Sequence, residues 1–302
     1  MINGIINIYK EQGFTSHDVV AKLRGIVGQR KIGHTGTLDP DATGVLPVCL
    51  GKATKLCDML TDKDKTYEAT LLLGVETDTQ DTTGTILNES NVQELTEEQV
   101  ENVIMSFVGD YEQIPPMYSA LKVNGKKLYE LAREGKVIER KARPVKILSI
   151  EITAINLPEV TMTVSCSKGT YIRTLCHDIG QQLQVGGCMK TLKRTKVSCF
   201  EIEQALTLSE VQELKNQGTL EECILPIDSV FQHLQRFDLP KELEFLAKNG
   251  NPLNVEKYAE IHGWKNKERV RVYDELGEFI GIYWYREENQ TLKLEKMFLE
   301  RE

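Results

Sequence analysis

The sequence predicts an α+β protein that ends in a small, mainly β domain. Segments typical of strands and of helices follow one another irregularly over the first 230 residues, whereas a doubly wound α/β fold shows a regular βαβ alternation. After about residue 230 the chain changes character, and two β-rich runs within 268–285 surround a turn at 274–277, which is the pattern of a hairpin. Since 302 residues suit one large and one small domain, we expect domains at 1–232 and 233–302.

The elements expected in the first half rest on capping signals and apolar spacing. Thr15 and Ser16 offer an N-cap ahead of apolar residues that recur at helical spacing up to position 27. Thr96 and Gln99 have the spacing of a capping box. The expected elements are a strand at 4–10, a helix beginning at 15–16, a strand at 66–75, a turn at 82–84 and a helix from 96 to about 107.

Prolines and glycines mark the boundaries of the later elements. Pro115 and Pro116 exclude regular structure around them, and Gly135 ends a short helix. Thr170 is expected to cap the helix that follows it. The expected segments are an irregular stretch at 113–117, a helix at 126–135, paired strands at 145–153 and 160–167, a helix at 170–183 and a strand at 291–299.

The net charge of −8 hides an uneven distribution. Residues 76–112 contain ten Asp and Glu and no Lys or Arg, residues 120–146 contain nine Lys and Arg with three Glu, and residues 166–200 contain six Lys and Arg with one Asp. These blocks therefore carry −10, +6 and +5. They are either ordinary solvated faces or an acidic outer surface beside a basic face that binds a partner, and charge alone leaves both readings open.

Composition argues against several classes of protein. The seven cysteines are odd in number and form no C-x-x-C pair, which favours reduced thiols. The histidines lack H-x-x-x-H and H-E-x-x-H spacing, which argues against a zinc site. No apolar run approaches the roughly 20 residues that span a bilayer, and the N-terminus lacks the basic region and cleavage pattern of a signal peptide. We therefore expect a cytoplasmic protein.

The stretch GHTGTLDPDATGVLP at 33–47 concentrates side chains that can do chemistry. Pro40 disfavours the helical conformation at Asp39, so we expect Asp39 to be presented from extended backbone. Gly36 and Gly44 permit sharp turns on either side of it. A carboxylate held in this way suits a nucleophile or a general base, and it equally suits an Asx turn that only shapes the loop.

Other chemistries fit this loop less well. Asp39-x-Asp41-x-Thr43 matches the D-x-D-x-T of aspartyl-phosphate phosphotransferases, but no buried strand precedes it. The remaining oxygens of a calcium loop, the second acid of a glycosidase and the G-K-[ST] of a Walker loop are missing. A single carboxylate remains, and a cation beside it would keep it ionised. Arg173 is the best candidate for that cation, although by itself it reads as a surface helix residue.

Three motifs together resemble the bacterial tRNA pseudouridine synthase B (TruB) family. They are GHTGTLDPDATGVLPVCLGKATK, the sequence KTY at 65–67 and CSKGTYIRTL at 166–175. The resemblance runs from about Gly4 to the C-terminus, where the tail is similar to a PUA domain, an RNA-binding β-barrel. It implies a mixed, mainly antiparallel sheet flanked by helices at 1–232, with an inserted basic RNA-binding segment at about 120–146. It also implies conversion of uridine 55 in the tRNA T loop into pseudouridine, without cofactor or metal.

The resemblance assigns roles to individual residues. Asp39 matches the catalytic aspartate, and Arg173 matches the arginine that pairs with it. Tyr67 matches the tyrosine that stacks on the flipped base and relays the C5 proton. The expected substrate-binding residues are His34 at the flipped nucleotides, Lys55 in a structural or phosphate-facing position, Leu192 near the target base and Arg194 as its basic neighbour. Asp41 is expected to be dispensable for chemistry.

One position departs from the family pattern. The family has K-P-x-G-x-T-S near its N-terminus, and this chain has Glu11 in place of the proline. We expect that segment to be structural.

The leading hypothesis is therefore an RNA-modifying isomerase that acts as a monomer on the T arm of tRNA. Two alternatives remain from the sequence. One is a tRNA-binding factor that has kept the scaffold without the chemistry, and the other is a glycoside or nucleoside hydrolase that releases free base.

Overall fold

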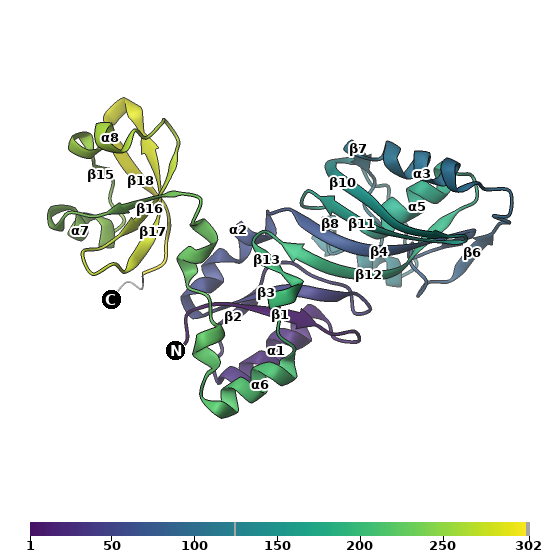
Figure 1. Ribbon diagram of the computed structural model, residues 1–302, viewed down its shortest axis with the longest axis horizontal. Helices are drawn as coiled ribbons and strands as arrows, with labels where there is room; N and C mark the ends of the chain where they lie inside the picture. Colours follow the sequence, from purple (N-terminus) through teal and green to yellow (C-terminus); the bar gives the residue numbers. More distant parts are fainter. Residues whose placement is uncertain (124, 300–302) are drawn as a thin grey trace.

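A computed structural model describes residues 1–123 and 125–299. Position 124 of the expected RNA-binding segment and positions 300–302 of the expected C-terminal domain lie outside the described residues. Within the described residues the chain forms two main β-sheets, of nine and five strands, which lie in two lobes joined by short helices (Figure 1).

The larger sheet is mixed and mainly antiparallel, as predicted. Its strands are β1 (Gly4–Lys10), β2 (Ile32–His34), β3 (Thr43–Leu50), β4 (Lys65–Leu73), β7 (Gly109–Gln113), β10 (Arg143–Asn156), β11 (Glu159–Cys166), β12 (Gly187–Val197) and β13 (Phe200–Glu201). The order is β1-β3-β12-β4-β11-β10-β7, with β2 beside β3 and β13 beside β12. Strands β3 and β12 pair in parallel, and the other neighbours pair antiparallel.

Helices cover the large sheet in two places and create two apolar cores. The helices of this lobe are α1 (Ser16–Val27), α2 (Cys57–Thr61), α3 (Glu97–Ser106), α5 (Ile172–Gln182) and α6 (Leu208–Gln217). Helices α1 and α6 pack beside β1 and β3, whereas α3 and α5 pack on β4, β10 and β11 (Figure 1). Short 3-10 helices connect the elements: η1 (Gly51–Leu56), η2 (Ile202–Gln204), η3 (Leu220–Cys223) and η4 (Ile227–Phe231).

Most local predictions are confirmed, and four are wrong in detail. Residues 126–127, expected to begin a helix, form a short strand, and the helix begins at Leu128. Thr170 does not cap α5, because Tyr171 is the N-cap residue and the Thr170 hydroxyl donates instead to the Ser167 carbonyl at 2.9 Å. Gln113 is the last residue of β7 rather than part of an irregular stretch. Strand β12 was not expected. Its alternation is interrupted by two register shifts, and three lysines lie along it.

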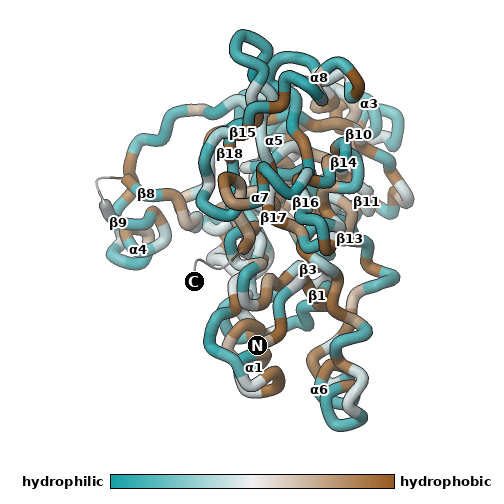
Figure 2. The backbone as a smooth tube through the Cα atoms, turned by 90° about the vertical axis from the view of Figure 1, so that its left-hand side faces the viewer, coloured by the Kyte–Doolittle hydropathy of each residue, from teal (hydrophilic) through white to brown (hydrophobic). Residues whose placement is uncertain are grey.

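A small subdomain projects from the large sheet between β7 and β10. It contains β8 (Lys122–Val123), β9 (Lys126–Lys127) and α4 (Leu128–Arg133), and it stands away from the body of the molecule (Figure 2). It has a minor core of its own around Met117, Leu128 and Leu131. We call residues 114–142 the projecting segment. The basic stretch predicted at 120–146 lies mostly within it.

The C-terminal lobe is a curled sheet with two helices. It comprises β14 (Gln235–Asp238), β15 (Leu253–Asn254), β16 (Arg269–Tyr273), β17 (Phe279–Arg286), β18 (Thr291–Met297), α7 (Lys241–Lys248), α8 (Glu256–His262) and η5 (Glu287–Asn289). The expected hairpin is β16–β17. The strand expected at 291–299 is β18. Ile282 and Phe298 join one apolar cluster with Leu56 and Phe231, so the two lobes share a core at their junction.

Between β4 and α3, β5 (Val75–Thr77) and β6 (Ile86–Glu89) form a short hairpin.

The seven cysteines, all among the described residues, are free thiols. No helix in the described part of the chain is long and apolar enough to cross a membrane.

Helix α5 approaches β12 very closely because both carry glycine at the contact. A Cβ added to Gly180 would lie 2.2 Å from the backbone nitrogen of Gly187 and 2.3 Å from the carbonyl carbon of Gly186. Backbone atoms cannot give way as a flexible side chain can. This contact therefore fixes how deeply α5 sits on the sheet.

We predict that Gly180→Ala lowers the free energy of unfolding by more than about 2 kcal/mol, because the new methyl group would force α5 away from β12. Gly25→Ala is the matched control: Gly25 lies exposed in α1, and its added Cβ would meet nothing within 4 Å. That change should raise stability by about 0.5–1 kcal/mol. Urea unfolding of both variants measures this, and equal effects would contradict the close approach.

Candidate active site

Asp39 lies in the connection between β2 and β3, in a loop closed by local hydrogen bonds. The Ala42 amide donates to the Asp39 carbonyl at 3.1 Å. Gly44 begins the return of the chain into β3 with φ of 105°. A Cβ at Gly44 would lie 2.2 Å from the Arg194 carbonyl oxygen on β12. Glycine is therefore required there by the close parallel pairing of the two strands.

The segment with the unusual Glu11 holds this loop in place, as expected of a structural motif. The Ser16 hydroxyl accepts from the Leu38 amide at 2.9 Å, and the Gly13 amide donates to the Pro40 carbonyl at 2.9 Å. The Lys10 ammonium donates to the carbonyls of Pro40, at 3.0 Å, and Ala42, at 2.5 Å. The backbone on both sides of Asp39 is thereby tied down.

Lys10 is a buried cation that is used to organise backbone. Its side chain is fully buried, and burial lowers the pKa of Lys10 to about 8. Its third contact is the carbonyl of Glu11, at 3.2 Å, so the acceptors of this ammonium are peptide oxygens. Lys10 is the lysine of the K-P-x-G-x-T-S motif, and the sequence assigned it no role in the site. Its signal was a lone lysine at the end of an otherwise apolar strand.

The Arg173 guanidinium lies between two carboxylates. It pairs with Asp39 through Nη2 and with Asp81 through Nη1, at 3.2 Å. Burial lowers the pKa of Arg173 to about 10. The Arg173 and Asp81 side chains are 8% and 13% exposed, whereas Asp39 is 44% exposed. The outer carboxylate therefore faces solvent while its partner stays covered.

Asp81 is the site residue that sequence reasoning missed. It belongs to the loop between β5 and β6, and its second carboxylate oxygen accepts from the hydroxyls of Thr79, at 2.7 Å, and Thr83, at 2.6 Å. The Gln80 carbonyl accepts from the Met189 amide on β12, at 3.0 Å. The available signal was the run TDTQDTTG, in which hydroxyl and carboxyl groups crowd a tight turn.

Tyr67 and Arg194 face each other across the pairing of β4 with β12. Arg194 is 1% exposed and donates to the carbonyls of Val45, at 2.8 Å, and Gly36, at 3.4 Å. Burial raises the pKa of Tyr67, and the neighbouring Arg194 charge opposes that rise. Arg194 thus binds the backbone on both sides of the Asp39 loop. Its direct contact with a substrate stays a prediction.

One apolar cluster brings the separate parts of the site together. Leu38 and Ala42, on either side of Asp39, pack in the same core as Tyr67 and as Ile172, the neighbour of Arg173. Leu192 is half-buried at the edge of this core. The structure therefore gathers Asp39, Arg173 and Tyr67 as the sequence analysis expected, and it adds Asp81 to them.

The other two predicted residues lie apart from that core. His34 ends β2, where its Nδ1 accepts from the Gly36 amide at 3.3 Å and its ring meets His17 edge-on. Burial, then the charge of His17, lowers the pKa of His34. Lys55 lies at the junction of the lobes and donates to the carbonyl of Met297 on β18, at 2.8 Å. This contact fits the structural alternative for Lys55, and a role in phosphate binding stays a prediction.

The expected basic face is smaller than the charge count suggests. In the block 166–200, Arg173 and Arg194 are buried, and the four lysines pair with acids on nearby elements. These pairs are Lys168–Asp62, Lys190–Glu159, Lys193–Glu68 and Lys196–Glu201. The excess positive charge that remains at the surface belongs mainly to the projecting segment.

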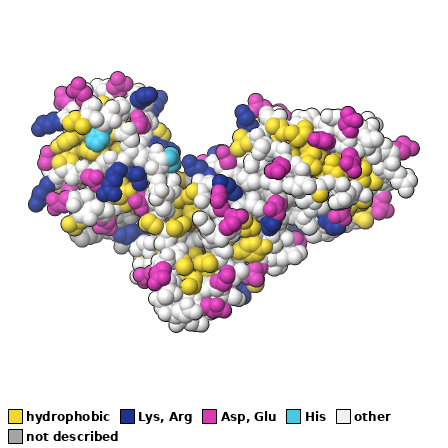
Figure 3. Space-filling view, viewed as in Figure 1, with side chains coloured by type: hydrophobic (Ala, Val, Ile, Leu, Met, Phe, Trp, Pro, Cys, Tyr) yellow, Lys and Arg dark blue, Asp and Glu magenta, His cyan; other side chains and the backbone are white. Residues whose placement is uncertain are grey.

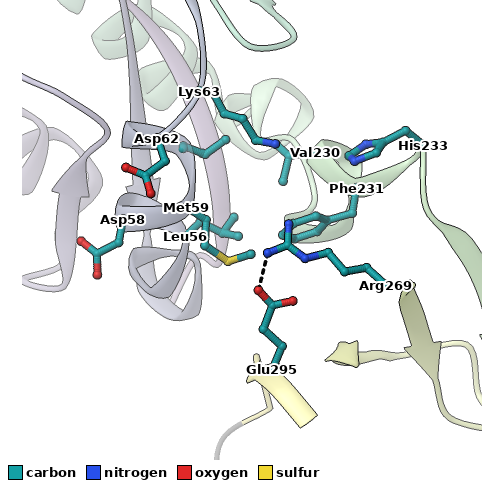
Figure 4. A pocket seen from close by; sticks show the side chains of 11 residues that line it. Leu56, Asp58, Met59, Asp62, Lys63, Val230, Phe231, His233, Arg269 and Glu295 are labelled. Carbon is teal, nitrogen blue, oxygen red and sulfur yellow. Dashed lines mark hydrogen bonds and ion pairs between the residues drawn. The ribbon is translucent and has the colours of Figure 1, made fainter. Parts of the chain in front are cut away.

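The surface is hollowed between the two lobes, with Lys and Arg side chains at the bottom of the hollow (Figure 3). A cavity of about 290 Å³ lies at the lobe junction, where Arg269 pairs with Glu295 and where Lys63 and His233 lie above this pair in the view of Figure 4. Its lining includes none of the residues gathered around Asp39. Among the described residues no cluster of three or more His, Cys, Asp or Glu is arranged to hold a metal ion.

Two family models match adjoining parts of this chain. The family model described as "TruB family pseudouridylate synthase (N terminal domain)" matches residues 24–172, and "tRNA pseudouridylate synthase B C-terminal domain" matches residues 173–232. The chain belongs to the TruB family. It is an enzyme of the tRNA pseudouridine synthase class, and such enzymes are isomerases.

Relatives and solved structures agree over the whole chain. Proteins named tRNA pseudouridine synthase B from Lachnoclostridium phytofermentans and Alkaliphilus oremlandii are 54% and 44% identical, over 99% and 100% of this chain and all of each relative. An H/ACA RNP bound to a substrate RNA containing 2′-deoxyuridine is similar, with a TM-score of 0.74 and 26% identity over 99% of this chain and 86% of that one. A Cbf5-Nop10-Gar1 complex is similar with a TM-score of 0.74 and 27% identity, over 99% of this chain and 85% of that one.

We predict that Lys10→Met slows pseudouridine formation at least tenfold, because the carbonyls around Asp39 lose their common donor. The free energy of unfolding should change by less than about 2 kcal/mol, since the cost of burying a charge disappears together with its hydrogen bonds. Single-turnover assays and urea unfolding measure the two quantities. Lys215→Met, at an exposed position of α6, is the control, and an unchanged rate for Lys10→Met would refute a role in loop support.

We predict that Asp81→Asn also lowers the rate at least tenfold while tRNA affinity changes less than threefold. The amide keeps an oxygen for Thr79 and Thr83 but removes the charge that fixes the second edge of Arg173. Asp78→Asn, in the same loop and exposed, should leave the rate unchanged. The assay is single-turnover conversion with filter binding, and equal rates for both variants would speak against the Asp81 contact.

Proposed function

We propose that the enzyme converts uridine 55 in the T loop of tRNA into pseudouridine, with Asp39 as the catalytic carboxylate. The observation that carries this proposal is the ion pair between Asp39 and the buried Arg173. Asp39 remains partly exposed, so it can meet a substrate without losing its partner. The name shared by the relatives supports tRNA as the substrate.

The proposed reaction moves one bond and leaves the composition unchanged. The N1–C1′ bond breaks, the uracil turns, and C5 joins C1′; the C5 proton leaves and N1 gains one. Asp39 either captures C1′ or assists loss of the 2′ proton, and both routes need an ionised carboxylate. A guanidinium beside the carboxyl favours that ionised form. The isomerisation needs no net electrons or groups from a cofactor.

Tyr67 is proposed to hold the base and to relay the C5 proton. Flipping the target nucleotide costs a few kcal/mol, and stacking on an aromatic ring returns about 1–3 kcal/mol. Because burial raises the pKa of Tyr67, its hydroxyl stays protonated at neutral pH and can pass a proton on. His34 and Leu192 are proposed to line the space around the flipped nucleotides.

The remaining contacts with tRNA are proposed for two parts of the chain. The projecting segment supplies positive charge for the phosphates. Residues 233–302 act as a PUA-like RNA-binding domain beside the domain at 1–232, with Lys55 and Arg194 supporting the site. The enzyme is proposed to work as a cytoplasmic monomer without metal or cofactor.

We predict that Asp39→Asn abolishes tritium release from a T-arm stem-loop labelled at uridine C5, while RNA affinity stays within about tenfold, because the change removes chemistry rather than contact area. The wild-type chain should release tritium at stoichiometric enzyme. Activity of Asp39→Asn at the wild-type rate would disprove the assigned role of Asp39.

The same assay separates the alternative functions. A pure tRNA-binding factor would retard the RNA on a gel without releasing label. A hydrolase would release free base and lower the mass of the RNA, whereas pseudouridine formation leaves the mass unchanged. Either result from the wild-type chain would reject the proposal.

A further inference from the structure

The buried side chain of Gln113 binds the backbone of a residue close to Arg173. Gln113 is 2% exposed at the end of β7. Its Oε1 accepts from the Tyr171 amide at 2.8 Å, and its Nε2 donates to the Tyr171 carbonyl at 3.0 Å. The side-chain amide therefore pairs with Tyr171 as a neighbouring strand would, and both of its polar atoms are used.

Tyr171 controls the first turn of α5. It is the N-cap residue in extended conformation, and its carbonyl also accepts from the amides of Thr174 and Leu175, both at 3.1 Å. Arg173 is the second residue of this helix. The Tyr171 side chain makes no capping hydrogen bond to α5. Gln113, which lies outside the helix, therefore fixes the turn that carries the Arg173 guanidinium.

A second contact holds the opposite side of the same turn. The Thr174 hydroxyl donates to the Gln80 side chain at 2.7 Å, and Gln80 precedes Asp81 in the loop that binds Arg173. The turn is thus held by two glutamines, one from the Asp81 loop and one from β7. Removing either hold lets the helix start shift, and a shift there moves the guanidinium relative to Asp39.

Gln113 is also the residue at which the projecting segment leaves the sheet. It pairs with Arg143 as the last pair of the β7–β10 ladder, and residues 114–142 lie between these two stems. The residue that directly precedes the projecting segment therefore binds the first turn of the helix that carries Arg173.

We propose that Gln113 is a positioning residue that ties the stem of the projecting segment to the first turn of α5 and so holds the Arg173 guanidinium on Asp39. This inference rests on the proposed function. It concerns a residue that touches neither the reacting atoms nor the substrate, so its effect must appear in the chemical step and in the pH profile.

The test uses the full-length chain with two substitutions and a control. Gln113→Met keeps the length of the side chain and removes both hydrogen bonds. Gln113→Glu keeps the acceptor for the Tyr171 amide but sets a carboxylate against the Tyr171 carbonyl, and protonation of that carboxyl restores a donor. Gln181→Met, exposed on the same helix, is the control. Thermal unfolding checks each fold, and single-turnover tritium release and T-arm affinity are measured from pH 5.5 to about 8.5.

Gln113→Met should lower the single-turnover rate at least tenfold at neutral pH with affinity within threefold. Its deficit should not depend on pH, because methionine carries no titratable group. The deficit of Gln113→Glu should shrink as pH falls, because protonation returns the second hydrogen bond. A general loss of packing would give Gln113→Glu a deficit that does not depend on pH either.

Wild-type rates in both folded variants, losses explained by weaker RNA binding, or a Gln113→Glu deficit that does not change with pH would overturn the inference. If Gln113→Met does not fold, the pH trend of Gln113→Glu decides alone. No tritium release from the wild-type chain would instead overturn the proposed function, and this inference with it. Release by wild type with unaffected variants would overturn only the role of Gln113.

Discussion

The site depends on one buried guanidinium that is shared by two carboxylates. Taking Arg173 out of water without a partner would be costly, and Asp39 and Asp81 compensate it from opposite edges. The two acids come from different loops, and the arginine comes from a helix. The chain must therefore place three distant segments within hydrogen-bonding reach before the Asp39 carboxylate has a fixed direction.

Strand β12 provides that placement. Gly187 admits α5 close to the sheet, Met189 pairs with the Asp81 loop, and Arg194 supports both Tyr67 and the Asp39 loop. Each of the three segments therefore takes its position from the same strand. Lys10 adds a second constraint on the Asp39 loop, from the last residue of β1. Its buried ammonium donates to the carbonyls of Pro40 and Ala42, which have no partner strand at that point.

The sequence was sufficient for the elements with local signals and for the pairing of Asp39 with Arg173. Capping residues placed α1 and α3, and the long motif with Tyr67 and Arg173 marked the site. Strand β12 was not predicted for two reasons. Two register shifts break the alternation of its apolar and polar residues, and its three lysines are typical of a surface segment rather than of a strand inside a sheet. Asp81, Lys10 and Gln113 escaped because their partners are distant in sequence, and no spacing along the chain reports a contact of that kind.

In the described part of the chain, the projecting segment has its own small core and joins the large sheet through its two stems, β7 and β10, while the lysines of the block 166–200 pair with acids at the surface. Under the proposed function, long-range attraction and bond breaking therefore belong to different parts of the molecule. In that proposal, ionic strength acts on the rate at which tRNA is first captured, because exposed charges are screened over about 8–10 Å in ordinary salt. The guanidinium of the Arg173–Asp39 pair is buried, so salt screens this pair less than it screens the fully exposed charges.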